Sequence, residues 1–299
     1  MKVSKILLCI FDNIESTGIR ILHSILSRKY ECKMLFIQEN NVDLILQVIH
    51  EYKPDVVGFS LVSVNWNFYK SLYPYLRKIE NCKIVLGGWH VILSYNECKQ
   101  YCDLVVRGEG EKVIEKIILD IENDFFKQEY IGPRADVKEQ LLPLLKIDDS
   151  YIIENGKYEN RDPLFSNYRY GLMIGRGCLK NCSYCSNSYS KNLYSDWNKI
   201  RYREYNKVIE ELILAKFRLP MINTIVFYDE IFMPPREGRV EFFETYKEKI
   251  GLPFYALFYP GTCSNELAGL LKKSGMDGVW MGVQSGSERV RKEVYNRYG

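Results

Sequence analysis

The sequence predicts an α/β protein with two domains, a doubly wound parallel sheet followed by an incomplete (β/α) barrel. Two observations carry this prediction. In both halves of the chain, short apolar runs typical of buried strands alternate with segments whose apolar residues recur at helical spacing. The chain also has 299 residues, which is too many for one ordinary core and enough for two.

Residues 1–125 are expected to form the doubly wound domain, with a flavodoxin-like fold. Short apolar runs predict five strands, at residues 5–11, 33–37, 55–60, 83–86 and 103–106. Helical spacing predicts helices at residues 18–29, 42–50, 67–79 (with a kink at Pro74) and 111–121. Sheets of this kind bind ligands at the carboxyl ends of their strands, near the switch point.

Residues 126–168 are expected to connect the two domains. This segment has turn signals at Gly132-Pro133 and Asp162-Pro163, and it shows no clean helical or strand period. It also lacks the Gly/Ser or charge-block composition of a disordered tether. We therefore expect it to pack across the surface.

Residues 169–299 carry the barrel pattern. Strands are expected at residues 171–175, 224–228, 254–258 and 278–283, and helices at 204–217, 239–249 and 266–273. In (β/α) barrels the chemistry lies at the carboxyl ends of the strands. Here those ends carry Asp229, Glu230, Gln284 and Ser285. A carboxylate after a strand can also be a simple helix cap.

The loop after the first barrel strand has the most specific pattern. Cys178, Cys182 and Cys185 stand in a CxxxCxxC spacing. Three thiolates this close can hold three corners of a [4Fe-4S] cube, and since the usual set is four cysteines, one iron is left for another ligand. Three cysteines can also bind zinc with a fourth ligand, so a structural zinc domain stays open. The other six cysteines lack cluster spacing, and we expect ordinary small apolar residues there.

The composition is that of a globular chain without a nucleic-acid or membrane partner. The net charge is +3, from 41 Lys and Arg against 38 Asp and Glu, so neither partner follows from charge. The apolar run at residues 6–11 is far too short for a signal segment or a membrane span. We expect a cytoplasmic location, where the nine cysteines are reduced or bind metal.

The second half resembles the radical S-adenosylmethionine (SAM) superfamily. CxxxCxΦC is its signature, with Tyr184 as the aromatic Φ, and FYDEIF at 227–232 and GVQSGSERV at 282–290 resemble its motifs after the second and fourth strands. In the first half, PDVVGFS, VLGGWH and DLVVRGEGE resemble the cobalamin-binding domain that precedes many of these enzymes. The family's partial barrel has six strands, so four indicate a C-terminally truncated chain. We expect a fragment of a longer protein or a partner that completes the barrel.

The resemblance implies roles for residues of the second half. The three cysteines would hold the cluster, whose open iron takes the amino and carboxylate groups of SAM. Carboxylates after the second strand would hold the methionyl ammonium, the aromatic Φ would lie near the adenine, and the fourth-strand residue would bond the ribose through an amide where the family usually has Glu. The expected SAM-binding set is Tyr184, Asp229, Glu230, Gln284 and Ser285.

For cobalamin, the resemblance places the serine after the third strand and the paired glycines after the fourth along the nucleotide tail and corrin. Many cobalamin proteins ligate cobalt through the His of DxHxxG, but Glu15 stands at that position, so this loop offers no imidazole. His90 is expected to be a helix cap or surface group. The expected cobalamin-binding set is Glu15, Ser60, Leu61, Gly87, Gly88, Gly108 and Glu109.

The function that the resemblance implies is reductive cleavage of SAM to a 5′-deoxyadenosyl radical, which takes a hydrogen atom from a small-molecule substrate. Cobalamin would most often transfer a methyl group to an unreactive carbon, and less often steer a rearrangement or cyclisation. An electron donor such as flavodoxin or ferredoxin is the expected partner. Two alternatives stay open: a non-catalytic fragment that binds corrinoid or cluster, and a radical SAM enzyme that no longer binds cobalamin. A methylthiotransferase is disfavoured because the first half lacks a second cluster-binding cysteine set.

Overall fold

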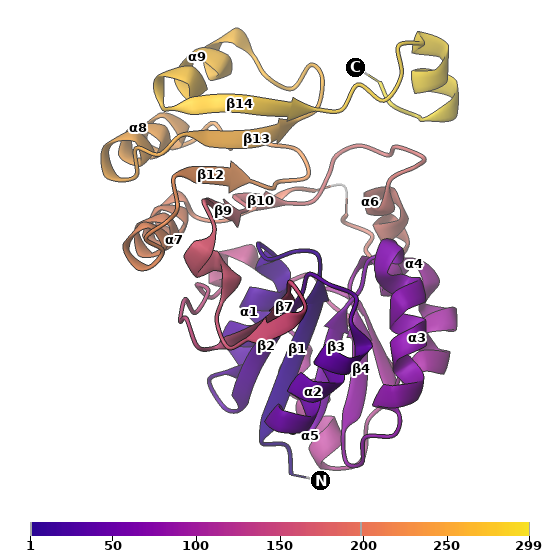
Figure 1. Ribbon diagram of the computed structural model, residues 1–299. Coiled ribbons are helices and arrows are strands. Elements are labelled where there is room, and N and C mark those ends of the chain that lie inside the picture. Colours follow the sequence, from indigo (N-terminus) through magenta and orange to yellow (C-terminus); the bar gives the residue numbers. More distant parts are fainter. Residues whose placement is uncertain (1, 198, 299) are drawn as a thin grey trace. The chain divides into compact units, whose positions relative to one another are not determined.

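The computed structural model describes residues 2–197 and 199–298 (Figure 1). By its internal contacts the chain divides into two compact units. The first comprises residues 1–135 and 141–163, and the second comprises residues 136–140 and 164–299. In the described part of the chain, no helix is both long and apolar enough to cross a bilayer.

The first unit is built on an eight-stranded sheet in the order β6-β5-β4-β3-β1-β2-β7-β8 (Figure 1). Seven strands run parallel, and β8 pairs antiparallel with β7. The chain changes its winding direction between β1 and β3, so the switch point lies at the loops after these two strands. The strands are β1 (Lys5–Phe11), β2 (Glu31–Ile37), β3 (Val56–Ser60), β4 (Lys83–Gly87), β5 (Leu104–Gly108), β6 (Glu129–Gly132), β7 (Ser150–Glu154) and β8 (Lys157–Glu159).

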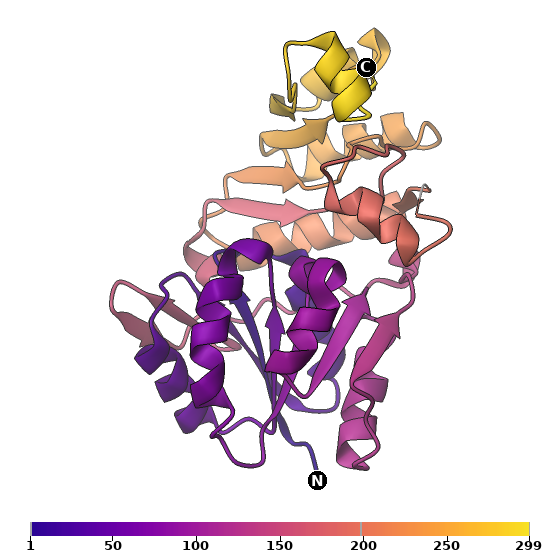
Figure 2. The same cartoon turned by 90° about the vertical axis from the view of Figure 1, so that its right-hand side faces the viewer.

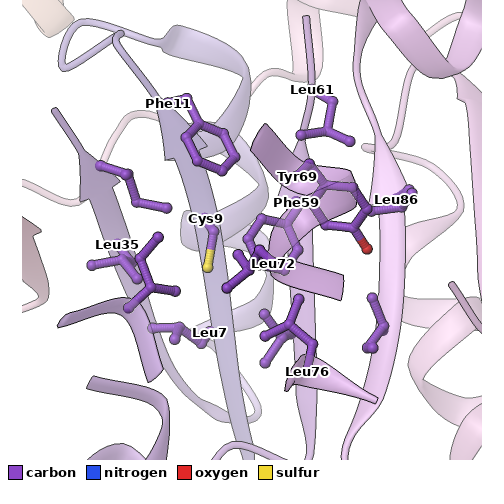
Figure 3. Close-up of a cluster of buried hydrophobic side chains, with 14 of the residues drawn as sticks. Leu7, Cys9, Phe11, Leu35, Phe59, Leu61, Tyr69, Leu72, Leu76 and Leu86 are labelled. Carbon is purple, nitrogen blue, oxygen red and sulfur yellow. The ribbon is translucent and has the colours of Figure 1, made fainter. Parts of the chain in front are cut away.

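Helices cover both faces of this sheet, which confirms the doubly wound arrangement. On one face, α2 (Val42–Tyr52), α3 (Trp66–Leu76) and α4 (Trp89–Cys98) share a buried cluster with every second residue of β1, and Figure 2 shows α3 and α4 on the same side of the sheet. Figure 3 shows Leu7, Cys9 and Phe11 of β1 in this cluster, together with residues of β3 and α3. The intervening residues of β1 pack against α1 (Thr17–Leu26) and α5 (Ile114–Glu122) on the other face.

The segment 126–168, expected to be a connection without regular structure, instead contributes three strands to the first sheet. The sequence pattern did not reveal β7 because this strand is short and buried on both faces. Ile152 lies in one core cluster and Ile153 in the other. A buried ion pair fixes the turn after β8, where Asp162 lies. Arg20 of α1 donates from Nη1 and Nη2 to the two Asp162 carboxylate oxygens, at 2.5 and 2.9 Å.

The second unit has a four-stranded parallel sheet in the order β14-β13-β12-β9, the incomplete barrel that the sequence predicts. The chain leaves β9 earlier than expected, and a short antiparallel pair, β10 and β11, forms beside the following loop. The strands are β9 (Arg169–Leu172), β10 (Gly175–Arg176), β11 (Arg201–Tyr202), β12 (Thr224–Phe227), β13 (Phe254–Phe258) and β14 (Met276–Met281). The helices are α6 (Ser186–Tyr189), α7 (Tyr205–Arg218), α8 (Arg239–Lys249) and α9 (Asn265–Lys273), followed by a π-helical turn at Val290–Val294.

Candidate functional site

The cluster loop, residues 175–185, brings its three cysteines together. Cys178 and Cys182 are buried, Cys185 is half-buried, and all three pack in one patch with Ile231 and Tyr259. Burial raises the pKa of the Cys178 thiol, and its neighbours Cys185 and Cys182 raise it further. The raised pKa favours the protonated Cys178 thiol, so a metal that binds this sulfur must displace its proton.

The donor set fits an iron–sulfur cluster better than a single ion. No three His, Cys, Asp or Glu side chains in the described ranges converge closely enough to hold one metal ion. A zinc ion needs all its ligands around one centre, whereas a [4Fe-4S] cube binds each thiolate through a different iron. Soft thiolates in an apolar, largely buried patch match that chemistry, and the Lys180 backbone N–H points at Cys178 Sγ at 3.4 Å.

Two carboxylates after β12 hold the start of the cluster loop. Asp229 is 2% exposed, and its Oδ1 and Oδ2 accept the backbone N–H groups of Gly175 at 2.6 Å and Ile174 at 3.1 Å. Glu230 Oε2 accepts the Gly177 N–H at 3.0 Å. Burial raises the pKa of Asp229 to about 7, although its N–H partners pull the other way. The geometry gives both carboxylates a part in shaping the loop, and the expected contact with a methionyl ammonium stays a prediction.

Gly175, where the chain enters the loop, leaves little room for a side chain. A Cβ at this position would lie 2.9 Å from Ile200 Cγ2 and 2.9 Å from the Tyr202 ring. Since real Cβ atoms essentially never approach heavy atoms this closely, a larger residue would force the Ile200 and Tyr202 side chains or the loop itself to shift. A shift of the loop would carry the Gly175 N–H off Asp229.

The far end of the loop meets the segment that follows β14. The Arg297 guanidinium donates to the Tyr184 hydroxyl at 3.2 Å and to the Gly282 carbonyl at 2.6 Å. Gln284 has a left-handed backbone (φ 67°), and its side-chain amide lies over Gly282, where a Cβ would come within 2.3 Å of Nε2. The sequence analysis missed Arg297, because it lies outside the motifs and meets the loop only through folding.

In the first unit, the loops after β3 and β4 are bonded to each other. The Leu61 N–H donates to the Gly87 carbonyl, and the His90 N–H donates to the Leu61 carbonyl, both at 2.9 Å. Gly88 has φ 93°, and a Cβ there would lie 2.6 Å from Leu61 N and O. The expected cobalamin residues Ser60, Leu61, Gly87 and Gly88 therefore form one tight unit, in which the Leu61 side chain is buried core.

The remaining expected cobalamin residues lie at other strand ends. Glu15 is buried in the loop after β1. Gly108 ends β5, and Glu109 follows it with Oε2 accepting the Ala135 N–H at 2.5 Å. Because β3 and β4 separate β1 from β5, the seven residues span four strand ends rather than one loop.

His90 differs from the expected cap or surface group. It is 6% exposed, its ring packs 4.6 Å from Trp66, and its Nδ1 lies 3.0 Å from Ser63 Oγ. Burial lowers its pKa, so the imidazole is neutral near pH 7. Its Nε2, and Oδ1 of the buried Asn65 at the switch point, lack hydrogen-bond partners among the described residues. Buried polar atoms of this kind fit a domain that receives a polar ligand.

Comparisons with known proteins agree with this arrangement. Residues 3–118 match the B12 binding domain family, and residues 172–298 match the Radical SAM superfamily. The cobalamin-dependent S-adenosylmethionine radical enzyme OxsB, solved with aqua-cobalamin bound, matches with a TM-score of 0.71 and 15% identity, over 97% of this chain and 45% of that one. That likeness shows the fold.

Relatives in sequence carry methyltransferase and cyclase names. The chain is 24% identical to the uncharacterized methyltransferase PH0819 of Pyrococcus horikoshii, over 91% of this chain and 61% of that protein. It is 23% identical to the anaerobic magnesium-protoporphyrin IX monomethyl ester cyclase of Cereibacter sphaeroides (83% and 43%), and 24% identical to the bacteriochlorophyllide d C-12(1)-methyltransferase of Chlorobaculum tepidum (92% and 57%). The chain thus spans about half the length of the curated relatives it matches.

Proposed function

Because the chain carries a B12-binding domain followed by a radical SAM domain, we propose that it acts in cobalamin-dependent radical methylation of an unreactive carbon in a small molecule. The observation that carries this proposal is the buried patch of Cys178, Cys182 and Cys185 in the radical SAM domain. The two domains imply a [4Fe-4S] cluster, SAM and cobalamin as cofactors. The relatives named as methyltransferases favour methyl transfer as the reaction.

The chain's own residues supply placement. When bound, the three cofactors supply one electron, a hydrogen-abstracting radical and a methyl group. The cysteines would hold three irons of the cluster, while Asp229 and Glu230 fix the backbone from which those cysteines project. Ile231 and Tyr259 cover the patch with apolar surface, which excludes water from a reactive site.

Cyclisation is a second candidate, because three relatives are named as magnesium-protoporphyrin IX monomethyl ester cyclases. Both reactions would use the same cluster patch and differ in the substrate and in the fate of its radical. In either case we propose a cytoplasmic enzyme with a small-molecule substrate and a flavodoxin or ferredoxin as electron donor. The near-balanced net charge of +3 gives no reason to add a nucleic acid.

Anaerobic reconstitution tests the proposal. The chain is loaded with iron, sulfide and hydroxocobalamin, then given SAM and reductant. Absorbance and EPR report the cluster and the corrinoid, and chromatography reports 5′-deoxyadenosine. We expect all three signals from the wild type and from C263A, which removes an exposed cysteine outside the loop, and loss of the cluster in C182A.

The other outcomes select among the alternatives. Absence of a cluster in the wild type would overturn every radical SAM interpretation. A cluster without 5′-deoxyadenosine would favour a non-catalytic fragment. SAM cleavage without retained corrinoid would favour an enzyme that no longer uses cobalamin.

A further inference from the structure

Arg297 is held against the cluster patch by groups other than the thiols. Its Nη2 donates to the Gly282 carbonyl at 2.6 Å, its Nη1 donates to the Tyr184 hydroxyl at 3.2 Å, and its guanidinium carbon lies 4.1 Å from the Tyr259 ring centroid. The same Nη1 is 3.9 Å from Cys182 Sγ. The guanidinium is therefore fixed beside the sulfur by three contacts that do not depend on it.

Among the described residues, this buried cation has no carboxylate to balance it. Arg297 is 9% exposed, and across the described ranges no Asp or Glu forms an ion pair with it. Lys180 adds a second positive charge, since its ammonium lies 4.2 Å from the same Tyr259 ring. A buried charge without a partner is costly. Of the three cysteines proposed to hold the cluster, Cys182 is the one whose sulfur lies beside this guanidinium, 3.9 Å from Nη1.

We propose that Arg297 is the counter-cation of the cluster and raises its reduction potential. Hydrogen bonds and positive charge at a cluster sulfur favour the more negative, reduced form. Arginine suits this role because it stays charged at every working pH and its planar fork reaches several acceptors at once. In this role Arg297 acts through Cys182 and is a positioning and tuning residue. The inference rests on the cluster site of the proposed function.

The test is an EPR-monitored redox titration of the anaerobically reconstituted full chain without SAM. R297Q removes the positive charge, and R297K keeps the charge but loses the planar guanidinium with its several N–H donors. R289Q is the matched control, because Arg289 is an exposed arginine of the same terminal segment. We expect R297Q to shift the reduction equilibrium about tenfold toward the oxidised cluster, which is 59 mV for one electron. R297K should shift it less, and R289Q should titrate like the wild type.

Iron content and far-UV circular dichroism are measured on the same samples. A folded R297Q that takes up less iron than R289Q also supports the proposal, because the cation then stabilises the negative charge of the bound cluster. If R297Q does not fold, R297M decides, because it also removes the charge: a midpoint below the wild type supports the proposal, and an equal midpoint overturns it. An R297Q cluster with wild-type midpoint and iron content overturns the inference alone. A wild type that takes up no iron overturns the inference and the proposed function together.

Discussion

Replacing Asp229 with asparagine tests whether this carboxylate holds the cluster loop. Its two oxygens accept the N–H groups of Ile174 and Gly175. Asparagine offers one carbonyl oxygen, and its NH2 group would face the other N–H. A buried donor left without its acceptor costs about 1–3 kcal/mol. That loss corresponds to about 5- to 150-fold in a local opening equilibrium.

Amide hydrogen exchange at residues 174–177 is the assay, because it reports the loop without requiring the two units to unfold as one. In D229N, the amides of residues 174–177 should exchange about 5- to 150-fold faster than in the wild type. The rates are measured near pH 5 and corrected for the intrinsic exchange rate of each amide. D277N is the control, since Asp277 is an exposed carboxylate of the same unit. Exchange in D229N equal to that in the wild type would refute the proposed anchoring.

The pH dependence of hydrogen exchange in the loop gives a second test of the same variant. Burial raises the pKa of Asp229 to about 7, whereas an unfolded aspartate titrates near 3.9. The folded chain therefore binds a proton that the unfolded chain has released. This contribution to stability is fully present below about pH 4 and is lost as the pH rises through about 7, at up to roughly 1.4 kcal/mol per pH unit. The protection that the wild type has over D229N should shrink between pH 5 and 7 and then stay constant.

Two further substitutions test the first unit by urea unfolding and by hydroxocobalamin retention. G88A places a Cβ within 2.6 Å of the Leu61 backbone at a residue with positive φ. It should lower the free energy of unfolding by about 1–3 kcal/mol and weaken corrinoid binding. G18A is the control, because its Cβ has open space in helix α1, and it should do neither. R20A removes the guanidinium that pairs with the buried Asp162 carboxylate and should cost about 3–5 kcal/mol, with unchanged iron uptake by the second unit. A loss under about 1 kcal/mol would show that the ion pair does not fix the turn after β8.

Local sequence patterns predicted the strands and helices that have a regular apolar period. They missed the features that depend on contacts between residues far apart in the sequence. Leu7, Cys9 and Phe11 alternate with residues of the opposite cluster, so β1 could be located from its apolar run. β7 is too short and too evenly buried to show any period. His90 is buried because Trp66 of another helix covers its ring. Arg297 reaches Cys182 across 115 positions of sequence, and no local spacing encodes such a contact.

The two anchors of the cluster loop lead to a last prediction about how the loop responds as a unit. Asp229 holds its start, and Arg297 holds the region of Cys182 and Tyr184 near its end. Neither anchor bonds the other within the described residues, so without iron the effects of D229N and R297Q on hydrogen exchange in the loop should add to within about 0.5 kcal/mol.

A bound cluster changes that expectation, because it joins Cys178 to Cys182 and Cys185 through bonds that span the loop. Disturbing one end must then disturb the other, and the double mutant should depart from additivity by more than about 0.5 kcal/mol. The comparison of iron-free and reconstituted protein in the same exchange experiment is its own control. Additive effects in both states would mean that the ends of the loop stay independent. The cluster would then be held by the cysteines alone, without help from the anchors around them.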